Sequence, residues 1–217
     1  MPAVTLGFLT EQLELGEQLL QAKGTIFTPQ DLPGRYGRVV KAVDHLLQIL
    51  ACEAVVAGGW AVWHHGYFAQ MTQNIDIVLA KEQVDGFLRT AAVSGFEVLA
   101  QPAGRWPKLR HKDTDVQVDI LPEGERPGTP RKPAPTTIPN PNMMGASGYL
   151  LRYVSLPALV ELKLAAGRGR DESDVIELMR ANPESADAIR KHLAGVHNQY
   201  VNESDRLHAR AREQEDN

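Results

Sequence analysis

The sequence predicts an α/β (α+β) fold, in which helices flank a mixed sheet and a helical C-terminal part follows it. Short apolar runs of strand length alternate with helically patterned segments through the first two thirds of the chain. A proline-rich segment, residues 122–141, then interrupts the pattern, with seven of the 14 prolines. Beyond Leu156-Pro157 the remaining segments have helical periodicity. This order favours a sheet domain followed by a helical unit.

Each expected element rests on its own pattern of apolar residues and on the glycines or prolines that end it. Val116–Leu121 alternates apolar and polar residues and forms the second arm of an expected hairpin around Asp113-Thr114. We expect helices over 5–22, 35–51, 59–66, 82–93, 157–166, 171–181 and 184–200, and strands over 54–57, 75–79, 96–99, 108–111, 116–121 and, at an edge, 148–155. The charged tail after residue 200 is expected to fray. We expect an N-terminal helical extension (1–34), a sheet core (35–155) and a C-terminal helical region (156–217).

Composition limits the possible classes of function. The chain has 217 residues, a net charge of −4 and a pI near 6.0, so bulk charge does not attract it to nucleic acid, although a local basic patch remains possible. The apolar runs are too short for a membrane span, and the N-terminus lacks the basic start of a secretory signal. The single Cys52 excludes an internal disulfide and any zinc site of several cysteines. We expect a cytoplasmic protein without a membrane partner.

Polar residues in two of the expected strands form the candidate site. In a strand, residues i and i+2 share a face, so Thr72, Asn74 and Asp76 point one way. Asp119 stands in an apolar strand, where an aspartate is costly to bury unless it is paired, hydrogen-bonded or bound to metal. If the two strands are neighbours, Asp76 and Asp119 converge beside the turn at Gly58-Gly59.

This arrangement suits phosphoryl or nucleotidyl transfer. Magnesium, or manganese in its place, takes oxygen ligands and commonly joins one or two carboxylates to substrate phosphates. Paired glycines let backbone N–H groups approach a triphosphate without an intervening side chain. The alternative for Gly58-Gly59 is an ordinary strand-to-helix turn, and the alternative for Asp76 and Asp119 is capping of nearby amides. We also considered Asp119 as the group that orients or activates an attacking hydroxyl.

Two segments together resemble the DNA polymerase beta-like nucleotidyltransferase superfamily, and in particular its small prokaryotic AbiEii toxin-type members. The first is Gly58-Gly59 followed by Thr72-x-Asn74-x-Asp76 and, on a later strand, Asp119. The second is similar to the pattern Leu-x-x-Leu-x-x-x-Lys-Leu-x-Ala-x-Arg-x-x-Asp-x-x-Asp, which this chain matches with Leu156, Leu159, Lys163-Leu164, Ala166, Arg168, Asp171 and Asp174. The resemblance covers roughly residues 35–180. Gln70 stands where relatives have arginine, and Asn74 where they have the first metal-binding aspartate.

The resemblance implies a metal-dependent enzyme that moves a nucleotidyl group from a nucleoside triphosphate to an RNA or protein hydroxyl. Asp76 and Asp119, with Asn74 as a weak third ligand, would hold Mg²⁺ or Mn²⁺. The nucleotide would contact Gly58, Gly59, Thr72, Lys163, Asp171 and Asp174. For Lys163 the alternative is a lysine extending from an apolar helix face. For Asp171 and Asp174 it is an N-cap and N3 pair at a helix start.

The same resemblance implies a toxin–antitoxin or phage-defence role with a cognate antitoxin. Because asparagine is neutral and offers one carbonyl oxygen, Asn74 also favours an alternative. That alternative is a catalytically inactive member that binds a nucleotide or a partner protein. A purely structural protein is the third possibility.

Overall fold

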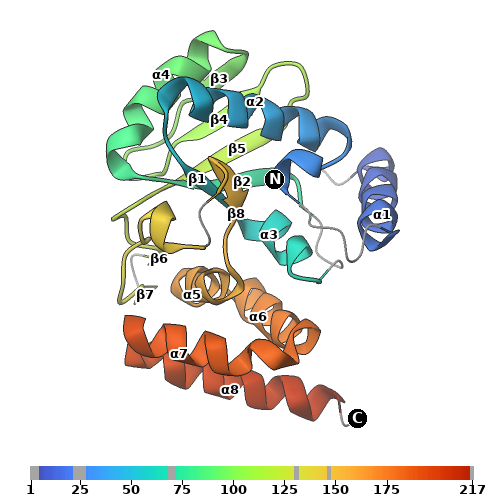
Figure 1. Cartoon of the computed structure of the whole chain (residues 1–217), viewed down its shortest axis with the longest axis vertical. Helices are drawn as coiled ribbons and strands as arrows, with labels where there is room; N and C mark the ends of the chain where they lie inside the picture. Colours follow the sequence, from blue (N-terminus) through green and yellow to red (C-terminus); the bar gives the residue numbers. More distant parts are fainter. Residues whose placement is uncertain (1–4, 22–27, 68–71, 130–131, 146–147, 216–217) are drawn as a thin grey trace.

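The computed structural model describes residues 5–21, 28–67, 72–129, 132–145 and 148–215. Figure 1 shows helices α2 and α4 on one side of the central sheet, with α3 and helices α5–α8 on the other. The helices are α1 (Leu6–Gln21), α2 (Gly34–Leu50), α3 (Gly58–His64), α4 (Val84–Val93), α5 (Leu156–Ala166), α6 (Gly169–Ala181), α7 (Ala186–Val196) and α8 (Asn198–Glu215). Short 3-10 turns lie at Pro29–Asp31, Lys81–Gln83, Pro141–Met143 and Pro183–Ser185.

The main sheet has six strands in the order β3-β4-β5-β2-β1-β8. They are β1 (Ala54–Ala57), β2 (Asn74–Leu79), β3 (Phe96–Leu99), β4 (Lys108–His111), β5 (Gln117–Pro122) and β8 (Leu151–Tyr153). The pairs β2–β5 and β1–β8 are parallel, whereas β1–β2, β3–β4 and β4–β5 are antiparallel. The mixed sheet predicted from the sequence is therefore confirmed, including the hairpin and the edge strand.

The two central strands differ sharply between their faces. Ile75, Ile77, Val118 and Ile120 are at most 1% exposed, whereas Asp76 and Asp119 on the other face keep some exposure. α2 contributes a stripe of buried residues at helical spacing to the core: Tyr36, Val39, Val40, Val43, Leu46 and Leu47. The apolar face of these two strands is thus packed in the core, and their other face carries the polar side chains.

The C-terminal part is helical as predicted, but its last helix was predicted wrongly. The expected helix over 184–200 is broken at His197, which is extended (φ −163°, ψ 132°), and α8 continues to Glu215. The His197 ring nitrogen accepts a hydrogen bond from the Gln199 N–H at 3.2 Å and so caps the second helix. The charged tail does not fray over its described length, because Leu207 and Ala211 are buried. α7 and α8 lie side by side in Figure 1.

The described part of the proline-rich segment is held against the rest of the molecule. It contains a small hairpin that the sequence did not predict, β6 (Gly128–Thr129) with β7 (Lys132–Pro133). The Arg126 guanidinium donates to the Ala134 carbonyl at 2.6 Å, and the Thr136 and Tyr200 hydroxyls are 2.9 Å apart. Ile138 is 1% exposed. The segment therefore crosses from the end of β5 to the helical part and packs on both.

Two smaller expectations concern cysteine and membranes. Cys52 is buried and unbonded to any other cysteine, as expected for a small core residue. Over the residues described, no helix combines the length and the apolar character needed to cross a membrane. The division of the chain into three units stays a prediction.

Candidate functional site

Strand register brings the predicted aspartates together. β2 and β5 are parallel neighbours in which Asp76 lies directly opposite Asp119 and Asn74 opposite Gln117. Paired residues share a face, so both carboxylates project from the polar side of the sheet. The predicted convergence of Asp76 and Asp119 is therefore confirmed as geometry.

Gly58 and Gly59 lie against the polar side chains of this face. Gly58, at the start of α3, has a φ of 62°, a conformation that a glycine adopts without cost. A β-carbon at Gly58 would overlap the Asp76 carboxyl group, and one at Gly59 would overlap the Thr72 side chain. The glycines thus allow the α3 start to approach these two polar side chains directly. The sequence predicted that the glycines allow the approach of a phosphate. It did not predict this direct contact with Asp76 and Thr72.

Asp76 is held in an environment that disfavours its charge. Burial raises the pKa of its carboxyl group from 3.8 to about 6, and the neighbouring charge of Asp119 acts in the same direction. The cations of Lys163, Arg168 and Lys108 act in the opposite direction without offsetting this. A divalent cation beside Asp76 would favour the ionised form, because opposite charges at short range stabilise each other.

Only one of the two carboxylate oxygens of Asp119 has a hydrogen-bond partner among the described residues. Its Oδ2 accepts a hydrogen bond from the Lys108 ammonium at 2.8 Å, and the Asn74 amide nitrogen lies 3.4 Å from the same atom. Its Oδ1 is buried and has no hydrogen-bond partner among the described residues. A buried carboxylate oxygen without a protein partner is costly, so water or a ligand is expected beside it.

Lys108 was missed by the sequence analysis. It lies directly opposite Asp119 in the antiparallel β4–β5 pair. Asp76, Asp119 and Lys108 therefore lie side by side on three neighbouring strands, and we call these three residues the carboxylate row. The signal was present in the predicted hairpin, because any residue opposite Asp119 must share its face. The expected strand ends did not fix the register.

The second predicted segment forms a buried ionic network. The Lys163 ammonium lies 2.5 Å from Asp174 Oδ2 and 3.4 Å from Asp171 Oδ1. Arg168 donates from Nε to Asp171 Oδ2 at 2.6 Å and from its backbone N–H to the same oxygen at 3.3 Å. The side chains of Lys163, Asp171 and Asp174 are 9%, 1% and 4% exposed. Lys163 is therefore already neutralised by carboxylates of this chain.

The helix start in this segment needs one correction. α6 begins at Gly169 with Arg168 as its N-cap, so Asp171 is the N3 residue and not the N-cap. Asp174 lies inside the helix and faces Lys163. Direct contacts of Lys163, Asp171 and Asp174 with a nucleotide stay a prediction, as do those of Gly58, Gly59 and Thr72. Gln70 lies outside the described residues.

The donor set fits one hard divalent cation. Asp76 and Asp119 supply carboxylate oxygens and Asn74 a carbonyl oxygen, which are ligands that Mg²⁺ and Mn²⁺ accept. The orphaned Oδ1 of Asp119 and the raised pKa of Asp76 are both relieved by a bound cation. Nowhere in the described part of the chain do three or more His, Cys, Asp or Glu side chains gather as a metal site. Water or substrate oxygens would complete the coordination.

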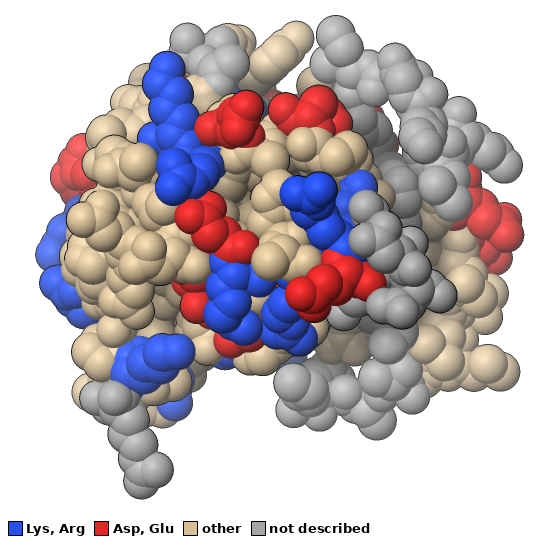
Figure 2. Space-filling model, turned by 90° about the horizontal axis from the view of Figure 1, so that it is seen from below, with Lys and Arg blue, Asp and Glu red and all other residues tan. Residues whose placement is uncertain are grey.

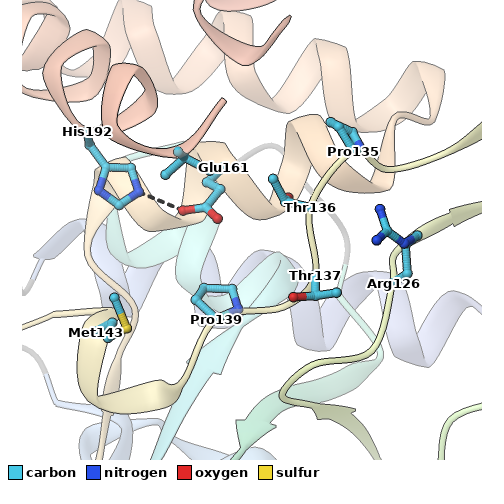
Figure 3. Close-up of a pocket in the computed structure, with 9 residues that line it drawn as sticks. Arg126, Pro135, Thr136, Thr137, Pro139, Met143, Glu161 and His192 are labelled. Atoms are coloured by element: carbon cyan, nitrogen blue, oxygen red, sulfur yellow. Dashed lines mark hydrogen bonds and ion pairs between the residues drawn. The ribbon is translucent and has the colours of Figure 1, made fainter. Parts of the chain in front are cut away.

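A cavity of about 410 Å³ lies elsewhere. Figure 3 shows it between the proline-rich segment, α5 and α7, with Glu161 and His192 on one wall and Arg126 and Thr137 on the other. The buried Glu161 carboxylate bonds the His192 ring nitrogen at 2.7 Å and so links α5 to α7. None of the carboxylate-row residues lines this cavity, so cavity volume alone would not have located the site.

Comparisons with known proteins give structural likenesses only. No family model matches the chain, and no curated protein does. The solved structures similar to it include ANT(2'')-Ia in complex with adenylyl-2''-tobramycin, at 14% identity over 82% of this chain and 97% of that one, with a TM-score of 0.41. The lincomycin-bound lincosamide antibiotic adenylyltransferase LnuA is 15% identical over 65% and 94%, with a TM-score of 0.46. A nucleotidyltransferase candidate from Thermotoga maritima is 17% identical over 74% and 93%, with a TM-score of 0.43. At these values the likeness carries no inference about activity.

Proposed function

We propose that this chain is a metal-dependent nucleotidyltransferase that moves a nucleotidyl group from a nucleoside triphosphate to an RNA or protein hydroxyl. One observation carries the proposal: Asp76 and Asp119 are paired across parallel strands beside a glycine turn, with one Asp119 oxygen unpartnered. A carboxylate pair kept short of compensating charge is poorly suited to stabilising a fold and well suited to holding a cation.

The reaction would exchange a phosphoanhydride linkage of the triphosphate for a phosphoester linkage to the acceptor. A bond forms between the acceptor oxygen and the α-phosphorus, the bond from that phosphorus to the pyrophosphate oxygen breaks, and pyrophosphate leaves. Asp119 would orient the acceptor hydroxyl and take its proton. A divalent cation, when bound, would neutralise charge on the phosphates. Backbone N–H groups at the α3 start, at Gly58 and Gly59, would contact these phosphates.

The distribution of charge on the surface bears on whether a long RNA can be the acceptor. On the face shown in Figure 2, acidic and basic side chains are interleaved, with no broad area of one sign. In the helical part Arg190 pairs with Asp205, and Arg206 with Glu172 and Glu203. A long RNA needs a continuous basic track, so it would have to approach over another face.

Labelled nucleotide transfer tests the proposal. The chain is incubated with each α-labelled nucleoside triphosphate, Mg²⁺ or Mn²⁺, and RNA or total protein, and compared with Asn74→Asp and Asp76→Asn. Transfer by the natural chain that Asp76→Asn abolishes supports the enzyme. Transfer by Asn74→Asp alone supports the second candidate, an inactive member that binds a nucleotide or partner protein, which Asn74 itself favours. Absence of transfer by every variant contradicts the enzyme, and absence of any nucleotide-induced thermal shift leaves a structural protein.

The cellular setting is a separate part of the proposal. A toxin–antitoxin or phage-defence role, with a cognate antitoxin, is supported only by the resemblance of the Gly58–Asp119 and Leu156–Asp174 segments to that family. The cytoplasmic location is a separate expectation from composition. Growth arrest on expression of the natural chain, relieved by Asp76→Asn, is the expected result. Equal growth with both chains would contradict this cellular role and would leave the proposed nucleotidyl transfer unaffected.

A further inference from the structure

We propose that the Lys108 ammonium group takes the place of one divalent cation, so that the site binds a single metal ion with the triphosphate. The inference rests on the proposed function and concerns how its site is charged. It arises from the position of Lys108 in the carboxylate row and from the neutral Asn74.

The backbone fixes Lys108 in this position. Lys108 and Asp119 are register partners in the β4–β5 pair, and β4 is held on its other side by β3. The side chains of Lys108 and Asp119 are 34% and 20% exposed, and their charged groups lie 2.8 Å apart. A lysine that only covered the surface would extend into water, whereas this one turns onto the carboxylate.

The charge of the site favours one added dication over two. With Asp76 and Asp119 ionised, their carboxylates carry two negative charges. Lys108 offsets one of them and Asn74 is neutral, so one negative charge remains. Two-metal sites place their ions ~3.5–4 Å apart, which requires carboxylates that bridge them. Here one carboxylate oxygen, Asp119 Oδ2, already accepts a hydrogen bond from an ammonium group, which would repel a second ion.

The two oxygens of Asp119 therefore have different tasks. Oδ2 is bonded to Lys108, while Oδ1 is buried without a described partner. Asp76 is the register partner of Asp119 on the neighbouring strand. A salt bridge that existed only to neutralise Asp119 would leave no reason for an unsatisfied oxygen. One cation held by Asp119 and Asp76 would stabilise both carboxylates, with Lys108 as the fixed positive charge on Asp119 Oδ2.

Manganese electron paramagnetic resonance tests this without relying on activity. The full chain is titrated with Mn²⁺ in the presence of a non-hydrolysable ATP analogue, and bound ions are counted per chain. We expect one ion with the spectrum of an isolated Mn²⁺. The double variant Asn74→Asp/Lys108→Met should bind two ions, with the exchange-coupled spectrum of ions ~4 Å apart. Lys108→Arg keeps the charge and should remain at one.

Arg110→Met is the matched control, because it removes a positive charge two residues along the same face of β4, where Arg110 pairs with Glu97. It should stay at one ion. Two coupled ions in the natural chain would overturn the inference, as would a single ion in the double variant when its circular dichroism shows that it is folded. Binding of no ion by the natural chain also overturns it. Failure of the proposed function is separable: one bound ion without label transfer contradicts the function and leaves the single-ion site standing.

Discussion

Two clusters in this molecule each combine two aspartates with a lysine, yet they are in opposite electrostatic states. In the helical cluster, Lys163 and Arg168 match Asp171 and Asp174 in charge, and the carboxylates are almost fully buried. In the carboxylate row, Lys108 reaches only one oxygen of Asp119, and Asp76 has a raised pKa. The comparison teaches that residue types alone do not mark a site; incomplete compensation does.

The largest expected effect on stability comes from a substitution in the helical cluster. Lys163→Met leaves Asp171 and Asp174 buried without their central cation, which should reduce the free energy of unfolding by ~3–5 kcal/mol. Urea denaturation followed by circular dichroism measures it. Lys108→Met is the comparison, because its partner is more exposed, and should cost less than ~1 kcal/mol. Equal losses in the two variants would erase the distinction between the clusters.

The glycine turn should be the next most sensitive point. Gly58→Ala forces a β-carbon into a left-handed conformation and against the Asp76 carboxyl group, so we expect a loss of ~1–3 kcal/mol. Gly86→Ala, in α4 where no atom lies within 4 Å of the added carbon, should instead stabilise by ~0.5–1 kcal/mol. Thermal unfolding of both variants compares them. A neutral Gly58→Ala would mean that the turn can move away from Asp76.

Asp76→Asn should stabilise the metal-free protein at neutral pH, the opposite of Lys163→Met. Because folding raises the pKa of Asp76 from 3.8 to about 6, the stability that it contributes is complete below pH 3.8 and is lost as the pH rises through about 6. Above that pH the variant should be more stable by ~1–2 kcal/mol, a value reduced for partial exposure. Denaturation at pH 4 and pH 7.5 measures the difference. A gain at pH 4 that equals the gain at pH 7.5 would contradict ionisation of a buried Asp76 as the cause.

Metal binding should follow the same titration with the reverse sign. A cation binds the ionised carboxylate, so the Mn²⁺ affinity should fall about tenfold for each pH unit below the Asp76 pKa of about 6. Isothermal titration with Mn²⁺ at pH 5 and pH 7 in the presence of the ATP analogue tests this. In Asp76→Asn the dependence should largely disappear. The same steep dependence in that variant would assign it to another group.

The strands could be predicted from the sequence because they are short apolar runs ended by glycine, proline or charged residues. β1 and β3 have the expected bounds, and the alternation in β5 placed Asp119 on the polar face. The break at His197 could not be predicted, because no proline stands there and both flanking segments have helical periodicity. The ion pairs of Lys163 could be predicted in part, because the sequence already indicates Asp171 and Asp174 as candidate residues. The burial of these ion pairs could not be predicted, because it depends on tertiary packing.

By itself the sequence determined the α/β order of elements, the polar face of β2 and β5, and the glycine turn, because side-chain periodicity and backbone freedom are local properties. Only the tertiary structure decided that Lys108 neutralises one oxygen of Asp119, that Lys163 is enclosed by two carboxylates, and that Asp76 is hard to ionise. Those three outcomes depend on strand register and on burial between distant segments. Electrostatic interactions are set by such distances and by the exclusion of water, which a linear sequence does not specify.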